Sequence, residues 1–169
     1  MAPQCSDPIV HGLGEIVIAF GNLELYVSAA IWQMLATDDK VLGQLAQAVT
    51  AEMSFDRKLH ALSSMFKLRS SSAADNQELA TLVTKLNRVQ QIRNQVLHSH
   101  WPLPRRLDER MRVKSSAKIR RGLQTRAATI TAGDIAAMVI EMARVGQEFA
   151  IFVHDKIQPP RKNTTGDET

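Results

Sequence analysis

Apolar residues recur at every third or fourth position through three long segments of this chain, and that spacing constrains the fold more than any other feature. The segments cover residues 9–35, 79–97 and 135–152. Side chains spaced in this way share one face of an α-helix, because a helix completes a turn every 3.6 residues or about 5.4 Å. The spacing therefore predicts three long helices that each bury one face, in an all-α fold.

Two shorter helices are predicted between the first two long segments, which gives four to five helices in all. One covers residues 41–51, and the next begins after Ser54, whose hydroxyl can cap a helix N-terminus. Their apolar stripes are Val41, Leu45, Ala48 and Val49 in the first, and Phe55, Leu59, Leu62 and Phe66 in the second. Start signals for the long helices are Asp7 with Pro8, Asp75 with Glu78, and Thr131 with Asp134.

Helical spacing is lost between residues 105 and 131. Pro102 and Pro104 end the preceding helix, because proline cannot continue the helical hydrogen bonds. The stretches RMRVKS and LQTRAATIT then alternate or favour strands, so we expect a short β-hairpin between the last two helices. We expect one domain over residues 1–158. Residues 159–169 have nothing apolar to bury and are predicted to form a disordered tail.

Size and composition favour a single cytoplasmic domain. The chain has 169 residues, 44% of them hydrophobic, which is enough for one core. Its single cysteine, Cys5, has no partner for a disulfide, and the N-terminal stretch lacks the apolar run of a secretory signal. The longest apolar segment is typical of a core helix and not of a membrane span, because Glu15, Asn22, Glu24 and Gln33 interrupt it.

Positive charge is concentrated in one segment. The whole chain has a formal net charge of +4, yet nine basic and only two acidic residues lie between positions 105 and 126, so the remainder is net acidic. Such a segment is typical of polyanion binding, with nucleic acid as the commonest partner in cytoplasm, although a solvated hairpin without a ligand has the same composition. The basic residues are Arg105, Arg106, Arg110, Arg112, Lys114, Lys118, Arg120, Arg121 and Arg126.

Two charged residues fall on apolar helix faces. Arg93 lies within the stripe of its helix, and Glu24 lies on the core-facing side of the first helix, between Phe20 and Val27. A buried charge needs a partner of opposite charge, because moving an unpaired charged side chain out of water into the protein core costs several kcal/mol of free energy. We therefore predict that the two helices pack together and that Glu24 and Arg93 form an ion pair, since arginine binds a carboxylate with two donors.

Asn94 and His98 lie at the margin of the helix that carries Arg93, one turn apart. Histidine side chains change protonation near neutral pH, which suits a general acid or base. A histidine in the last turn of a helix can equally bind the free carbonyl groups there. Both roles stay open on spacing alone. Trp101 is predicted to plug the core where the helix ends.

The stretch RNQVLH, with Arg93, Asn94 and His98 at the end of a long core helix and a tryptophan after it, resembles the motif of the HEPN superfamily of prokaryotic helical domains. FGNLELYVS in the first helix and SFDRKLHAL in the third give supporting context, and the resemblance covers about residues 8–155. It implies an up-and-down helical bundle that forms a homodimer and brings two copies of the motif to one cleft.

Many members of this superfamily are metal-independent endoribonucleases of toxin–antitoxin, abortive-infection and other phage-defence systems. The resemblance implies that Arg93 and His98 form the catalytic pair, with Asn94 as the polar residue beside the arginine. The RNA 2′-hydroxyl would attack, His98 would move a proton, and Arg93 would stabilise the phosphorane charge without a metal or cofactor. The basic segment would hold the RNA backbone, and a cognate antitoxin is a further expected partner.

The spacing within the motif opposes this assignment. Five residues separate Arg93 from His98, which is about 140° around an ideal helix. Arg93 reaches both Glu24 and His98 in one subunit only if the helix end is distorted or the long side chain extends to the boundary; otherwise a dimer completes the site. A non-catalytic module that binds RNA or a partner protein, and an unrelated bundle with a structural Glu24–Arg93 pair, are the alternatives.

Overall fold

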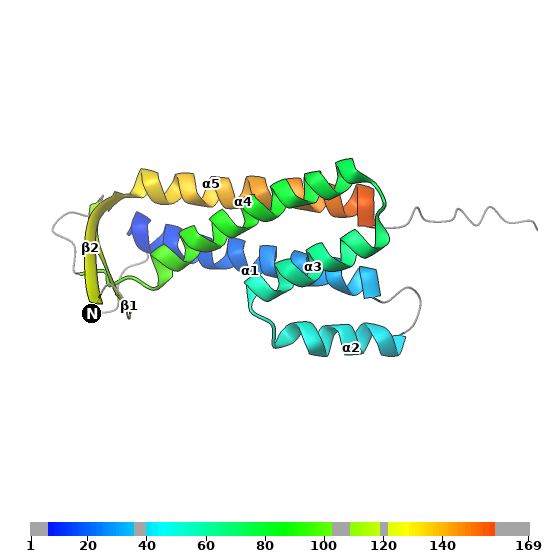
Figure 1. Cartoon of the computed structure of the whole chain (residues 1–169). Coiled ribbons are helices and arrows are strands. Elements are labelled where there is room, and N and C mark those ends of the chain that lie inside the picture. The colour runs from blue at the N-terminus through cyan, green and yellow to red at the C-terminus, as the bar shows by residue number, and fades with distance from the viewer. Residues whose placement is uncertain (1–6, 36–39, 103–108, 119–121, 158–169) are drawn as a thin grey trace, which may run out of the picture.

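A computed structural model describes residues 7–35, 40–102, 109–118 and 122–157 of the chain (Figure 1). It confirms a helical bundle with a β-hairpin between its last two helices. The elements are α1 (Pro8–Leu35), α2 (Lys40–Ala51), α3 (Phe55–Arg69), α4 (Ala73–Leu97), β1 (Glu109–Lys118), β2 (Gly122–Thr131), α5 (Ala132–Phe152) and the π-helical turn η1 (Val153–Ile157). The predicted tail, residues 159–169, lies outside the described residues.

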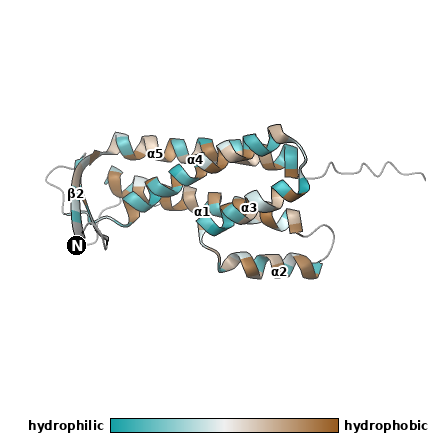
Figure 2. Cartoon of the chain, in the orientation of Figure 1, coloured by the Kyte–Doolittle hydropathy of each residue, from teal (hydrophilic) through white to brown (hydrophobic). Residues whose placement is uncertain are grey.

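The bundle is built around α1, which packs against α2, α3, α4 and α5. The helices α1, α4 and α5 run along the long axis of the molecule, whereas α2 lies on its outer side and the hairpin lies at one end (Figure 1). Hydrophobic and hydrophilic residues are interspersed along the helices (Figure 2). Because the hydrophobic residues recur at every third or fourth position, each long helix has one buried face, as the spacing predicts.

The core contains the predicted apolar stripes of four helices. Ile16, Leu62, Leu86 and Phe149, from α1, α3, α4 and α5, are each fully buried. Trp101 is partly buried against this core, and its indole N–H donates to the carbonyl of Val96 at 3.0 Å. The structure thus confirms the predicted place of the tryptophan at the end of α4.

The apolar stripe of α2 does not face the core. Val41, Leu45 and Val49 are 62%, 56% and 56% exposed, whereas the buried positions of this helix are Ala46 and Thr50. The small residues face α1, where the indole of Trp32 donates to the Thr50 hydroxyl at 2.6 Å. The helix therefore packs through its small side and leaves an apolar surface exposed.

Helix starts agree with the sequence at all points but one. The Asp7 carboxylate accepts the N–H groups of Ile9 and Val10 at the start of α1. Ser54 caps α3, and Thr131 and Asp134 form a reciprocal capping box at α5. The predicted pairing of Asp75 with Glu78 at α4 is wrong, because Ser72 is the cap and accepts the Asp75 N–H at 3.2 Å.

The hairpin is antiparallel, with Glu109 opposite Thr131 and Lys118 opposite Gly122. It is joined to the segment after α4 by two backbone hydrogen bonds between His100 and Val113, of 2.8 and 2.9 Å. Of the described helices, only α1 is long and apolar enough to cross a membrane by length and composition, a test that buried core helices also pass.

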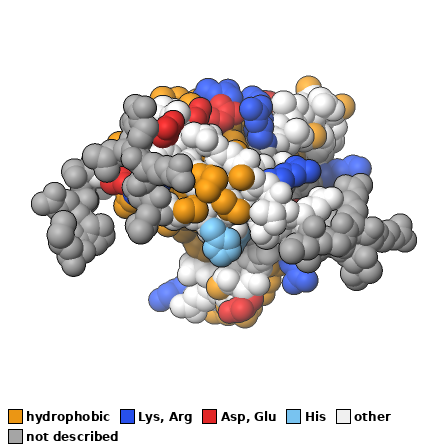
Figure 3. Space-filling view, turned by 90° about the vertical axis from the view of Figure 1, so that its left-hand side faces the viewer, with side chains coloured by type: hydrophobic (Ala, Val, Ile, Leu, Met, Phe, Trp, Pro, Cys, Tyr) orange, Lys and Arg blue, Asp and Glu red, His pale blue; other side chains and the backbone are white. Residues whose placement is uncertain are grey.

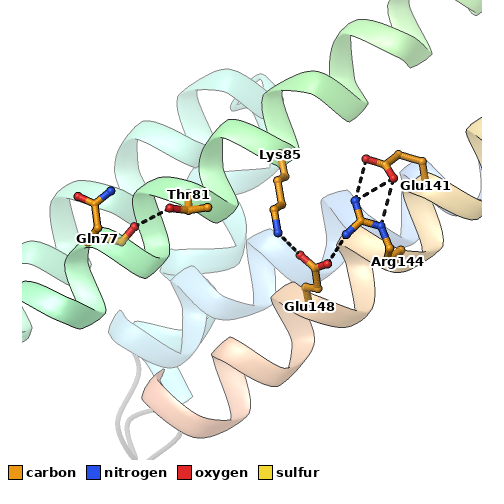
Figure 4. Close-up of polar contacts among 6 residues, drawn as sticks. All are labelled: Gln77, Thr81, Lys85, Glu141, Arg144 and Glu148. Atoms are coloured by element: carbon orange, nitrogen blue, oxygen red, sulfur yellow. Dashed lines mark hydrogen bonds and ion pairs between the residues drawn. The ribbon is translucent and has the colours of Figure 1, made fainter.

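An ion-pair network joins α4 to α5 on the surface (Figure 4). Lys85 Nζ lies 2.6 Å from Glu148 Oε2, and Arg144 lies between Glu148 and Glu141. The hydrogen bond from Lys85 lowers the pKa of Glu148, and the charge of Arg144 adds to this against the opposing effect of burial. Glu148 is therefore held in its ionised form.

Candidate functional site

The motif residues lie where α4 ends. The last helical residue is Leu97, and His98 leaves the helical path as the C-cap, with φ −97° and ψ 25°. Its backbone N–H still donates to the carbonyl of Asn94 at 3.3 Å. Because the backbone turns away at His98, the histidine side chain is no longer held at the position that an ideal helix would give it.

Arg93, Asn94 and His98 form one cluster. Arg93 Nη1 donates to Asn94 Oδ1 at 3.0 Å and lies 3.4 Å from His98 Nε2. Since a guanidinium has only donors, the contact leaves Nε2 as an acceptor. Arg93 and Asn94 are half-buried, whereas His98 is exposed. The cluster therefore combines a cation, an amide and an accessible imidazole.

Aromatic packing fixes the arginine. The guanidinium of Arg93 lies over the ring of Phe20 at 5.3 Å from its centroid, and Phe20 packs against Phe55 with centroids 4.9 Å apart. A cation over an aromatic face is attracted by the electrons of the ring. The side chain thus extends from the buried stripe of α4, over α1, to the helix boundary, which was one of the arrangements left open by the spacing.

The predicted ion pair between Glu24 and Arg93 is wrong. Glu24 Oε1 instead accepts from Lys58 Nζ at 2.8 Å, and the Lys58 side chain is only 8% exposed. Sequence reasoning missed this lysine, although its place between Phe55 and Leu62 on the apolar stripe of α3 was the available signal. Because Lys58 occupies the carboxylate, Arg93 is free to contact Asn94 and His98.

Cations of β1 reach the same helix end. Lys114 Nζ donates to the Asn94 carbonyl at 3.3 Å, and Arg112 Nη1 donates to the Gln95 carbonyl at 3.1 Å. The Asn94 carbonyl also accepts the His98 N–H, and the Gln95 carbonyl also accepts the Ser99 hydroxyl. The two cations add to these hydrogen bonds and lie at the negative end of the helix dipole, which favours positive charge. The hairpin is therefore attached to the motif and is not a freely solvated basic arm.

Arg110 attaches the hairpin to α1, because it forms an ion pair with the N-cap residue Asp7. Burial raises the pKa of Asp7, but hydrogen bonds from the Val10 N–H and from Arg110 outweigh it and leave that pKa lowered. The N-terminus of α1, the hairpin and the end of α4 are thus joined by charged contacts at one end of the bundle.

Of the remaining predicted RNA-binding residues, the structure describes the side chain of one and only the backbone of another. Arg126 is exposed on β2, and Lys118 lies in β1 with only its backbone described. Arg105, Arg106, Arg120 and Arg121 lie outside the described residues. RNA binding by these residues stays a prediction.

Positive charge at the cluster has no acidic counterpart among the described residues. None of Arg93, Arg112, Lys114 and Arg126 forms an ion pair with a carboxylate there. The view onto the hairpin end shows lysine and arginine side chains around the face, together with some aspartate and glutamate side chains, and hydrophobic side chains and a histidine near its centre (Figure 3). A negatively charged ligand suits this end of the molecule.

The described residues contain no group of three or more histidine, cysteine, aspartate or glutamate side chains that could hold a metal ion. A separate groove of about 350 Å³ between α1 and α5 is lined mainly by small and apolar residues, including Ala19, Ala143 and Gly146. That groove lacks the combination of cation, amide and imidazole found at the end of α4.

In comparisons with protein-family models, curated proteins and solved structures, no match to this chain was found.

Proposed function

We propose that this chain is a metal-independent endoribonuclease of the HEPN type, acting as a toxin or defence effector. The observation that carries the proposal is the contact of one guanidinium, that of Arg93, with both Asn94 and His98. Cleavage of RNA through its own 2′-hydroxyl requires only proton transfer and stabilisation of negative charge. Both are within the chemistry of an imidazole and an arginine held at hydrogen-bond distance.

In the proposed reaction, Arg93 turns from His98 Nε2 to the phosphoryl oxygens, and the freed Nε2 accepts the proton of the 2′-hydroxyl as the 2′-oxygen bonds to phosphorus. The bond from phosphorus to the 5′-oxygen breaks, and the leaving oxygen takes a proton from water, so that a 2′,3′-cyclic phosphate and a 5′-hydroxyl result. The proton on His98 then passes to the hydroxide that remains. Arg93 stabilises the extra negative charge on the phosphoryl oxygens. Asn94 orients Arg93 through the 3.0 Å hydrogen bond.

The proposal includes a homodimer in which a second copy completes the cleft. Val10 and Val17 are 46% and 50% exposed on α1, and Val17 precedes Phe20, the ring under Arg93, by one helical turn. Apolar side chains beside a polar site are a suitable margin for a protein interface. A two-fold contact through this surface would bring two Arg93 clusters close together.

Cleavage in the presence of a chelator tests the proposal. Purified protein with excess EDTA should cut a single-stranded RNA and leave 2′,3′-cyclic phosphate ends, identified by mass spectrometry. The same sequence with 2′-O-methyl groups should remain intact, because the attacking hydroxyl is blocked. Products with 3′-hydroxyl ends, or no cleavage across a range of RNA sequences, would contradict the assigned reaction.

The second candidate is a non-catalytic module that binds RNA or a partner protein such as an antitoxin. The outward stripe of α2, with Leu45 and Val49 each 56% exposed, favours a protein partner. Salt distinguishes the two ligands, because binding of a polyanion weakens steeply as salt rises, whereas an apolar protein contact does not.

A further inference from the structure

Three cations of β1 with described side chains lie on the side of the hairpin that faces the bundle. Arg110, Arg112 and Lys114 occupy alternate positions, and alternate residues of a strand share a face. Their contacts with Asp7, with the Gln95 carbonyl and with the Asn94 carbonyl show that this face is turned toward the helices. The hairpin therefore forms a cationic wall beside the Arg93 cluster.

Arg126 extends this wall from the second strand. It lies directly opposite Lys114 in the antiparallel register, so both side chains lie on the same face of the sheet. Like charges placed directly opposite each other destabilise a sheet. Within the described ranges, no carboxylate forms an ion pair with either residue, so the repulsion between them is not offset by an acidic side chain.

We propose that Lys114 and Arg126 form a subsite for the RNA backbone phosphate next to the one that is cleaved. Lys114 Nζ lies 3.3 Å from the carbonyl of Asn94, whose side chain holds Arg93, so the subsite and the cluster share a residue. A phosphate between the two cations would relieve their repulsion and accept charge-assisted hydrogen bonds. The inference rests on the proposed function for the position of the cleaved phosphate.

Binding of an RNA analogue that cannot be cut tests the subsite apart from catalysis. A fluorescent single-stranded 2′-O-methyl oligonucleotide is titrated with the full chain at several salt concentrations, and anisotropy gives Kd. The variants are Lys114→Gln, Arg126→Gln and the double variant. Lys67→Met is the matched control, because it removes one exposed lysine from the last turn of α3. Arg126 is exposed, so its replacement leaves the fold intact.

Each single variant should bind about fivefold more weakly and lower the slope of log Kd against log salt by about 0.7, because one phosphate contact is lost. Lys67→Met should match the wild type. A double variant with wild-type affinity and slope would overturn the subsite, as would equal weakening by Lys67→Met. Inorganic phosphate at matched ionic strength should not displace the oligonucleotide. Displacement would show that the site binds free phosphate rather than the RNA backbone and would overturn the proposal. Intact binding with no RNA cleavage would contradict only the proposed function.

Discussion

Arg93 Nη1 lies 3.4 Å from His98 Nε2, although the two residues are five positions apart at the end of one helix. On a straight helix their side chains would diverge by about 140°. Two features bring them together. The backbone leaves the helical path at His98, and the arginine side chain extends over Phe20 to the helix boundary. A single subunit can therefore assemble the cluster that the spacing alone placed on two sides of the helix.

The Glu24–Lys58 pair predicts an asymmetric response to mutation. Lys58 is buried and Glu24 is 38% exposed, so Glu24→Gln leaves a buried ammonium without its carboxylate and should cost about 1–3 kcal/mol of the free energy of unfolding. Lys58→Met leaves a carboxylate that water can solvate, and should change that free energy by less than about 1 kcal/mol. Urea unfolding measures both. Equal losses in the two variants would refute the asymmetry.

Close packing of α1 on α5 depends on Gly12. A methyl group there would meet Cγ2 of Ile135, a buried β-branched side chain that cannot move aside easily. Gly12→Ala should therefore lower the free energy of unfolding by about 1–3 kcal/mol. Gly21→Ala is the control, because its added methyl meets nothing within 4 Å; it should stabilise α1 by about 0.5–1 kcal/mol. Thermal unfolding of both variants measures these changes. A Gly12→Ala variant as stable as the wild type would contradict the close packing of Gly12 against Ile135.

Acid should weaken the contact between α4 and α5 (Figure 4). The pKa of Glu148 is lowered in the folded chain, chiefly by the hydrogen bond from Lys85. A group with a lowered folded pKa stabilises the protein above its unfolded pKa, which is about 4.3 for glutamate, and that contribution is lost as pH falls through the folded pKa. Lys85→Met should therefore be less stable than wild type at pH 7 and approach it in acid. A difference in the free energy of unfolding that stays constant with pH would contradict this.

The proposed dimer makes Val17 a sensitive position. Arginine at this half-exposed site would place a charge in the contact beside the Arg93 cluster, so Val17→Arg should yield monomers in sedimentation experiments and reduce cleavage. Ile140→Arg is the matched control, because Ile140 is 68% exposed on α5 and lies outside the proposed contact. Dissociation by Ile140→Arg but not by Val17→Arg would place the contact elsewhere.

The helices were predictable from local patterns, because each long helix carries an apolar stripe such as Leu86 and Val89 on α4. The hairpin was predictable in the same way, because Pro102 and Pro104 end the preceding helix and apolar and basic residues alternate in the stretch that follows. The face of α2 was not predictable, because its stripe has the spacing of a buried helix and only tertiary contacts show that Ala46 and Thr50 are the buried side. Local spacing describes a face but does not state what covers it.

At the site, the sequence singled out the three residues, but it predicted neither the contact between Arg93 and His98 nor the partners of the cluster. Arg93, Asn94 and His98 are close in sequence, so their proximity depends on one helix end. The partner of Glu24 depends on which of several cations arrives from another helix, and Lys58 of α3 reaches it. The contact of Lys114 with Asn94 depends on how the hairpin folds back, which no local pattern specifies.

The most direct test of the nuclease account compares two neighbouring histidines. His98 contacts Arg93, whereas His100, also exposed, takes part in the hairpin only through its backbone. In single-turnover cleavage of RNA with EDTA, His98→Ala should lower the rate by about 100-fold or more at unchanged thermal stability, and His100→Ala should cut at the wild-type rate. Full activity in His98→Ala, or equal loss in both variants, would contradict the account.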